Sequence, residues 1–358
     1  MSPEDFHDKP FDEGTLTKLQ IFELYAREWL PVFLAPEKPW RNAIHVFDFF
    51  AGPGTDIQNI PGSPLRLLRQ LQEYRGAQGW GKVRIHVHFY DEDSGKIAQL
   101  KQNIASHGLQ LPNVTFDIQP LRFDDAFRAS ELTLADSQAA KLVFIDQTGV
   151  THVTPEVFRK LVNAPTCDFL FFLSSSTLHR FRDHPTIWQK INRPEDYYHV
   201  HRAALEYYRG LLSPGQEYYL APFSIKKGAN IYGLIFGSAH PLGIDKFLEV
   251  VWRKDEFSGE ADFPIDRENI RPHQLLLPMA EVQASKITAF ENELEKLLRG
   301  GCLSSEVDVM RVCFENGVKR QHARPVLAKL KKEGVLDVEF QVPDVQKIRS
   351  PRPIRMRK

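Results

Sequence analysis

The chain has 358 residues and no formal net charge at pH 7; 42% of its residues are hydrophobic and 26% are charged. This length predicts more than one domain, and the composition is that of an ordinary globular protein, without the apolar run of a membrane span or the apolar leader of a signal peptide. The three cysteines, Cys167, Cys302 and Cys313, are too scattered for a disulfide framework or a CxxC metal site, so we expect a cytoplasmic protein without bound metal.

The first part of the chain alternates short apolar runs with stretches of helical periodicity. Helices are predicted over residues 16–34, 63–74, 94–107, 124–132 and 155–162, and strands over 44–50, 84–90, 114–119, 141–145 and 168–173. Such alternation predicts a parallel sheet with helices on both faces.

The alternation ends after a helix over about 200–212. Two strand-like runs follow, 218–225 and 231–238, and the five residues between them are too few for a crossover, so the pair is predicted to be an antiparallel hairpin. Five parallel strands closed by a hairpin are the plan of the Rossmann-like methyltransferases, whereas a nicotinamide-binding domain ends in another parallel strand. We therefore predict a Rossmann-like, S-adenosylmethionine-binding domain over residues 1–255.

The rest of the chain predicts a linker and a smaller domain. Residues 256–280 are irregular and contain Pro264, Pro272 and Pro278. Residues 281–358 give helices over 287–298, 306–315 and 322–333 and a strand over 335–342, which together are typical of a winged helix.

Positive charge is concentrated in this smaller domain. Residues 318–358 contain 12 Lys and Arg against 4 Asp and Glu, a net charge of +8, which leaves −8 for the remainder. A basic segment on an acidic body favours a polyanion partner, although a solvated surface or a protein-binding winged helix would share the pattern. The predicted nucleic-acid contacts lie on the third helix or at its start: Lys319, Arg320, Arg324, Lys329 and Lys332.

The strongest local motif is the run from Val46 to Gly54, in which a buried strand leads directly into Gly-x-Gly. Glycines there let the backbone turn sharply and approach a ligand, so Ala51, Gly52 and Gly54 are predicted to contact the cofactor. Asp48 lies inside the apolar strand, where a carboxylate needs a partner such as an amino group. Ile57 stands where a dinucleotide fingerprint has its third glycine, which disfavours a nicotinamide cofactor.

Three more carboxylates follow strands of the predicted sheet. Asp91 follows the second strand, where a carboxylate can accept hydrogen bonds from ribose hydroxyls, although Glu92 and Asp93 are adjacent alternatives. Asp124 follows the third strand and is a predicted adenine contact, with a helix cap as the alternative reading. Asp146 ends the fourth strand and is the predicted catalytic residue, placed to orient or deprotonate a methyl acceptor.

Several of these segments together resemble the three-Cys-motif partner (TcmP) family of bacteria and phages. The resemblance covers about residues 16–255 and rests on Lys18–Leu30 with Tyr25-x-x-x-Trp29, Asp48–Gly54, Pro61–Pro64, Phe144–Asp146 and Tyr232–Gly243. It implies a methyltransferase-like fold and a separate partner protein that carries a three-cysteine motif, which the cysteines of this chain do not form.

The chain departs from the expected pattern after Asp146. Proline, an aromatic residue and glycine are expected there, but the sequence is Gln147-Thr148-Gly149. Amino-methyltransferases use such an aromatic residue to stack a flipped base, so that acceptor chemistry is placed in doubt. Two functions remain open: an S-adenosylmethionine-dependent methyltransferase acting on DNA or RNA, and a non-catalytic subunit that binds nucleic acid or its partner.

Overall fold

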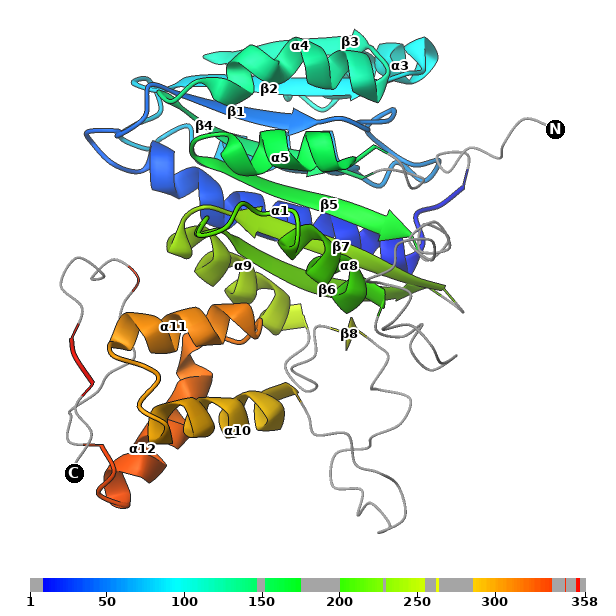
Figure 1. The fold of residues 1–358 in the computed structure, drawn as a ribbon. Coiled ribbons are helices and arrows are strands. Elements are labelled where there is room, and N and C mark those ends of the chain that lie inside the picture. Colours follow the sequence, from blue (N-terminus) through cyan, green and yellow to red (C-terminus); the bar gives the residue numbers. More distant parts are fainter. Residues whose placement is uncertain are drawn as a thin grey trace.

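The computed structural model describes residues 9–146, 152–174, 200–227, 230–254, 262–263, 286–336, 345 and 352–354. The central feature is an eight-stranded sheet with the order β3-β2-β1-β4-β5-β7-β6-β8 (Figure 1). Its strands are β1 (Ala43–Asp48), β2 (Arg84–Asp91), β3 (Val114–Pro120), β4 (Ala139–Ile145), β5 (Cys167–Ser174), β6 (Tyr219–Lys227), β7 (Asn230–Ser238) and β8 (Asp262–Phe263).

The strand directions confirm the predicted fold class. Strands β1 to β5 pair in parallel, and β7 pairs antiparallel with both β5 and β6. The hairpin therefore closes a parallel sheet, which is the arrangement of the Rossmann-like methyltransferase fold. From β1 the chain continues to β2 and β3 on one side of β1, and then crosses to β4 on its other side. The strand order therefore reverses between β1 and β4.

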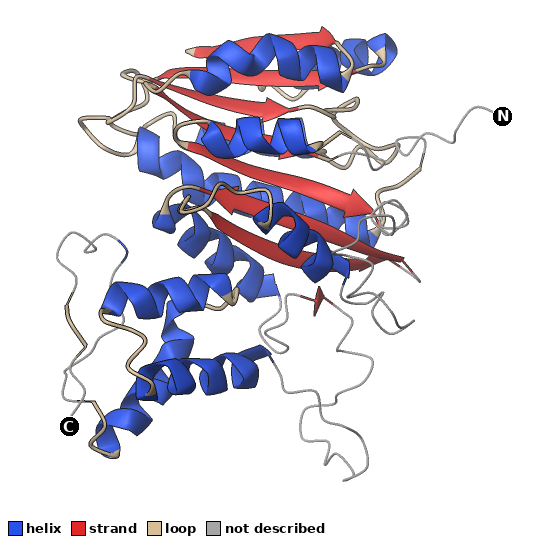
Figure 2. Cartoon of the chain, viewed as in Figure 1, coloured by secondary structure: helices blue, strands red, loops and turns tan. Residues whose placement is uncertain are grey.

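Helices cover both faces of the sheet (Figure 2). Apolar side chains of one face pack with α1 (Glu13–Leu34), α2 (Ser63–Glu73), α3 (Ser94–Ser106) and α9 (Pro241–Lys254). Those of the other face pack with α4 (Phe123–Ala135), α5 (Pro155–Asn163) and α8 (Val200–Arg209). The sequence marks several helix starts: Asp12 caps α1, Asp93 caps α3, and Thr154 caps α5 ahead of Pro155.

Helix α1 is fixed to the sheet by a buried polar contact as well as by apolar packing. The Tyr25 hydroxyl donates to Asp168 Oδ2 over 2.6 Å; Tyr25 is fully buried, and Asp168 is partly buried. Burial raises the pKa of Asp168 to about 6, while hydrogen bonds from Ser238, Tyr25 and Trp29 act against the rise. The Tyr25 and Trp29 of the family-like motif thus hold α1 against β5.

Removal of the Tyr25 hydroxyl tests this anchor. We expect Tyr25→Phe to lower the free energy of unfolding by about 2 kcal/mol, because Asp168 loses a donor in a buried place. Urea denaturation at pH 7.5 measures the loss. Tyr74→Phe is the matched control, because the Tyr74 hydroxyl donates to the Arg27 carbonyl oxygen in an exposed contact. Equal losses in the two variants would contradict the anchoring role.

The C-terminal unit has three helices and packs against α9 and β6 through α11 and the residues that follow it. Its helices are α10 (Lys286–Arg299), α11 (Glu306–Glu315) and α12 (Arg324–Lys332), with a 3-10 turn over Arg320–Ala323 before α12. Trp252 Nε1 of α9 donates to the Gly317 carbonyl oxygen over 3.1 Å, and Arg320 bonds both carboxylate oxygens of Asp245 at 2.7 and 2.9 Å. The helices match the predicted ones, but residues 337–342 of the predicted wing strand lie outside the described residues.

The structure differs from the sequence-based expectations at two places. Helix α9 was not predicted, although His240-Pro241 is a reasonable helix start. Asp262 and Phe263, inside the predicted linker, pair with Ser224 and Ile225 of β6. No helix among the described residues is long and apolar enough to cross a membrane.

Candidate functional site

The carboxyl ends of β1 and β4 place a buried carboxylate at the point where the strand order reverses. Asp48 is the last residue of β1 and lies opposite Phe144 of β4. Its side chain is 1% exposed, and Oδ1 accepts a hydrogen bond from the Phe50 amide over 3.1 Å. Oδ2 is buried and has no hydrogen-bond partner among the described residues. A buried carboxylate oxygen without a donor indicates a position that a ligand can complete.

The electrostatics of Asp48 follow from this burial. Burial raises the pKa of Asp48 to about 7, against the lowering effect of the Ser63 hydroxyl and the Phe50 amide. The nearby carboxylates Asp146 and Asp91 raise it further. Ser63, the first residue of α2, therefore lies at the site. A cation beside Asp48 would stabilise its ionised form.

The turn after β1 has the geometry that the glycine motif predicts. Gly52 and Gly54 have φ of 59° and 87°, in the left-handed region that favours glycine. The Ala51 amide donates to the Tyr90 carbonyl oxygen over 2.9 Å, and the Gly52 amide donates to Asp91 Oδ2 over 3.2 Å. The turn thus joins the ends of β1 and β2 beside Asp48.

Of the three adjacent acidic residues after β2, the structure places Asp91 at the turn. Asp93 is the N-cap of α3 and accepts from the Gly95 and Lys96 amides, while Glu92 is exposed and 4.0 Å from Arg122. Asp124, unlike Asp48 and Asp91, does not lie at the turn after β1. It lies exposed in the first turn of α4, whose N-cap residue is Arg122, and it acts electrostatically on His152.

Asp146 lies just beyond β4 and pairs with a residue that the sequence did not single out for chemistry. Lys18 Nζ, from α1, donates to Asp146 Oδ1 over 2.6 Å and to Oδ2 over 2.7 Å. The two side chains are 17% and 18% exposed, and Nζ lies 5.0 Å from the ring centroid of Phe172. The site therefore combines a buried carboxylate, a glycine turn and a largely buried ion pair. No group of side chains suited to a metal ion occurs in the described part of the chain.

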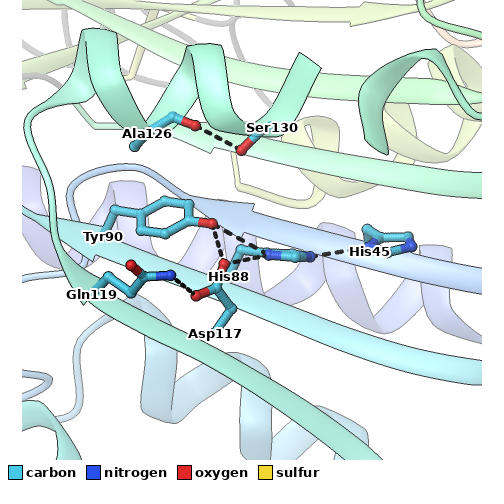
Figure 3. A network of polar contacts seen from close by, with 7 residues as sticks. All are labelled: His45, His88, Tyr90, Asp117, Gln119, Ala126 and Ser130. Carbon is cyan, nitrogen blue, oxygen red and sulfur yellow. Dashed lines mark hydrogen bonds and ion pairs between the residues drawn. The ribbon is translucent and has the colours of Figure 1, made fainter. Parts of the chain in front are cut away.

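A second polar network lies on the α4 face of the sheet (Figure 3). His88 Nδ1 lies 3.2 Å from Asp117 Oδ2, which also accepts from the Tyr90 hydroxyl, and His45 Nδ1 lies 2.9 Å from His88 Nε2. The contact with His88 is the largest cause of the lowered pKa of Asp117. Since Tyr90 also accepts from Ala51 through its carbonyl oxygen, the network supports the strand that carries Asp91.

This network predicts a loss of stability in acid. Burial lowers the pKa of His45 to about 3, with His88, His86 and Lys141 adding to the effect and Asp136 opposing it. Because the unfolded chain binds this proton near pH 6.5 and the folded chain does not, the contribution of His45 to stability is present above pH 6.5 and is lost toward pH 3.

We expect the free energy of unfolding of the protein to fall between pH 6.5 and pH 4.5. In His45→Phe the fall should be smaller by about 1–2 kcal/mol, a figure reduced for the screening of the partly exposed His45 by solvent. Urea denaturation of both proteins at each pH measures the difference. Identical pH slopes would show that His45 is not held neutral by the fold.

Three of the five predicted nucleic-acid contacts pair with acidic residues of the same chain. Lys319 Nζ lies 3.9 Å from Glu249 Oε2, and Arg320 bonds Asp245, so both hold the C-terminal unit against α9. Lys329 Nζ lies 2.8 Å from Glu295 Oε2 of α10. Arg324 and Lys332 are exposed on α12, as is Lys331. All four basic residues of α12 are thus exposed, and Glu295 pairs with one of them, Lys329.

Comparisons with known proteins give a fold likeness but no family. No family model matches the sequence, and no curated protein matches it. Similar solved structures include the O-methyltransferase TomG of Streptomyces achromogenes in complex with SAM, which is 12% identical, with 63% of this chain and 89% of that chain covered and a TM-score of 0.34.

Two others give similar values. The SAM-dependent methyltransferase of Agrobacterium tumefaciens is 8% identical, with 63% and 62% covered and a TM-score of 0.33. A methyltransferase of Geobacter sulfurreducens is 13% identical, with 63% and 79% covered and a TM-score of 0.31. At these scores the fold assignment rests on the strand order of this chain, and the function must be argued from its site.

Proposed function

We propose that this protein is an S-adenosylmethionine-dependent methyltransferase that acts on nucleic acid together with a partner carrying a three-cysteine motif. The observation that carries the proposal is Asp48 Oδ2, which is buried at the carboxyl end of β1 and has no hydrogen-bond partner in the described part of the chain. In open α/β sheets, ligands bind beyond the carboxyl ends of the strands at the point where the strand order reverses. Asp48 lies at that point, next to the glycine turn.

The residues present fit this cofactor. Asp48 would accept from its ammonium group, Asp91 would meet its ribose hydroxyls, and the main chain at Gly52 and Gly54 would allow its close approach. When bound, S-adenosylmethionine supplies a methyl group on a positively charged sulfur. The carboxylates of Asp48, Asp91 and Asp146 complement that positive charge. Asp124, exposed on α4, has no comparable support as an adenine contact.

Nucleic acid as the target is supported by the C-terminal unit. Residues 318–358 carry a net charge of +8, and Arg324, Lys331 and Lys332 are exposed on α12. Such a cluster attracts phosphates, and Lys319, Arg320 and Lys329 add less because they are already paired. The three-cysteine partner is supported by the sequence resemblance. Cys167 and Cys313 are buried in this chain and Cys302 is exposed.

A non-catalytic binding subunit is the second candidate. It is favoured by the Lys18 ion pair, since both carboxylate oxygens of Asp146 already have a donor. The two functions differ in turnover. We expect the full chain, with S-adenosylmethionine labelled in its methyl group, to transfer label to total RNA or DNA, and Asp48→Asn to transfer none. The assay is run with and without cell extract, which supplies the partner. If the protein binds the labelled compound saturably but transfers no label in either case, the non-catalytic subunit is favoured.

The salt dependence of nucleic-acid binding tests the role of α12. We expect Arg324→Gln and Lys332→Gln each to reduce the slope of log affinity against log salt by about 0.7–0.9, the loss of one phosphate contact. Fluorescence anisotropy with a labelled oligonucleotide at several salt concentrations measures the slopes. Lys329→Gln is the matched control on the same helix and should change the slope less, because Lys329 pairs with Glu295. An unchanged slope in the first two variants would exclude α12 as the binding surface.

A further inference from the structure

We propose that the methyl acceptor is a hydroxyl group, held between Lys18 and Asp146. In a nucleic acid this is the 2′-hydroxyl of ribose, so the target is RNA and not DNA. The inference rests on the proposed function and goes beyond it, because it derives the acceptor from the ion pair at the end of β4. Both residues of this pair would contact the acceptor: Asp146 takes the hydroxyl proton, and Lys18 donates a hydrogen bond to the hydroxyl oxygen.

The hydrogen-bonding capacity of the pair defines what can bind to it. Lys18 Nζ carries three donors, and the two oxygens of Asp146 lie 2.6 and 2.7 Å from it, so at least one donor remains for another group. No further hydrogen-bond acceptor for Lys18 occurs among the described residues; the ring of Phe172 lies 5.0 Å away. Each oxygen of Asp146 also keeps a second lone pair. The pair thus offers one donor and at least one acceptor side by side.

A hydroxyl group matches both, because it donates one hydrogen bond and accepts others. The exocyclic amino group of a base donates only, since its lone pair is delocalised into the ring. Charge gives the same preference. Methylation of an amine builds positive charge on nitrogen, which the Lys18 ammonium repels, whereas an oxygen that loses its proton is stabilised by that ammonium. The absence of an aromatic residue after Asp146, where the sequence is Gln147-Thr148-Gly149, also argues against a stacked base.

The fold holds Lys18 in place before any acceptor binds. On the same helix, Phe22 stacks on Phe144 of β4 with ring centroids 4.3 Å apart, and Tyr25 bonds Asp168 of β5. The Lys18 and Asp146 side chains are less than one fifth exposed, so their charges act in a partly dehydrated place. Fixed charges in such a place stabilise developing charge without having to reorganise.

The chemistry balances with these two residues. An oxygen lone pair of the acceptor forms the new bond to the methyl carbon, and the sulfur–carbon bond of the donor breaks with its electron pair remaining on sulfur. The hydroxyl proton passes to Asp146 and from there to water. Because DNA has no 2′-hydroxyl, the pair would separate RNA from DNA at the reacting atom.

Binding without turnover gives the first test. Anisotropy is measured with a ribo-oligonucleotide and the deoxy-oligonucleotide of the same sequence, each with S-adenosylhomocysteine present. We expect the protein to bind the ribo form about ten-fold more tightly, the value of one hydrogen bond to a charged group. Lys18→Met and Asp146→Asn should bring the ratio near one, and Lys18→Arg should retain part of the preference.

Lys246→Met is the matched control, because Lys246 forms a similarly half-buried ion pair with Glu28 of α1, 3.1 Å apart and away from Asp146. It should leave the preference intact. Equal binding of the two oligonucleotides by the unmodified protein would overturn the proposal, as would a preference that Lys18→Met retains.

The position of the transferred methyl group gives the second test. RNA and DNA are incubated with labelled S-adenosylmethionine and the RNA is hydrolysed with alkali, which cannot cleave next to a 2′-O-methyl group. We expect the label in alkali-resistant dinucleotides. Label on bases or in DNA would overturn the hydroxyl assignment and leave the proposed methyltransferase function standing. Label in neither nucleic acid, or failure of the donor to bind, would instead overturn the proposed function and the acceptor assignment with it.

Discussion

Asp48→Asn is expected to weaken S-adenosylmethionine binding by about 100-fold and, at pH 8, to stabilise the ligand-free protein. The binding loss follows because the ammonium group of the ligand would lose its buried anionic partner. The gain in stability follows because the ionised carboxylate is buried and its Oδ2 has no hydrogen-bond donor among the residues that the structure describes. Equilibrium dialysis with labelled ligand and urea denaturation measure the two effects.

The sign of the stability effect depends on pH. The pKa of Asp48 is raised to about 7 in the folded protein, above its usual value near 3.8, so folding favours the protonated form. Its stabilising contribution is full below pH 3.8 and is lost as the pH rises to about 7. The unmodified protein should therefore lose free energy of unfolding between pH 5 and pH 8, whereas Asp48→Asn should not. We expect the difference in free energy of unfolding between the two to shift by about 2 kcal/mol in favour of the variant, somewhat less than 1.36 kcal/mol for each pH unit from 5 to 7. A variant that binds normally, or one that is destabilised at pH 8, would contradict this assignment.

Gly237→Ala is expected to lower the free energy of unfolding by about 3 kcal/mol. Gly237 in β7 lies directly opposite Phe169 of β5, and a Cβ atom at this position would overlap the Phe169 ring. That ring is fully buried and packs edge-on against Phe158, so it cannot move without disturbing the core on the α5 face. Overpacking of a close-packed core is destabilising.

The matched control is Gly81→Ala, an exposed glycine around which a Cβ would meet nothing within 4 Å. It should change the free energy of unfolding by no more than about 0.5 kcal/mol. Urea denaturation of both variants under one set of conditions gives the comparison. A Gly237 variant as stable as the Gly81 variant would show that the β5–β7 pairing is looser than described.

The fold was predictable because short stretches of the sequence indicate its strands, helices and hairpin. The alternation of apolar runs and helical stretches gave the parallel strands, and the five-residue connection gave the hairpin that the β6–β7 pairing confirms. Helix α9 is not among the predicted elements, because it begins at Pro241, directly after the strand β7 that ends at Ser238. The pairing of Asp262 and Phe263 with β6 could not be foreseen, since two residues carry no periodicity.

Only the part of the site at the carboxyl ends of neighbouring strands was predictable from the sequence. Asp48, Gly52 and Asp91 lie together because neighbouring parallel strands end at one edge of the sheet. The partner of Asp146 was not predictable, because Lys18 is 128 residues away in the sequence and reaches it only through the packing of α1. For the same reason the ion pair between Arg320 and Asp245 was not predictable, because 75 residues separate them and only the packing of the C-terminal unit on α9 brings them together.

Calorimetric titration of the full chain with S-adenosylmethionine at pH 6.5, in two buffers of different ionisation enthalpy, tests the central claim most directly. Asp48 is largely protonated at this pH before the ligand binds and must ionise to meet the ammonium group. We predict saturable binding at one site per chain, with release of well over half a proton from Asp48, and loss of this release in Asp48→Asn. Absence of binding by the folded protein, or binding with the same proton release in Asp48→Asn, would contradict the placement of the cofactor at the end of β1.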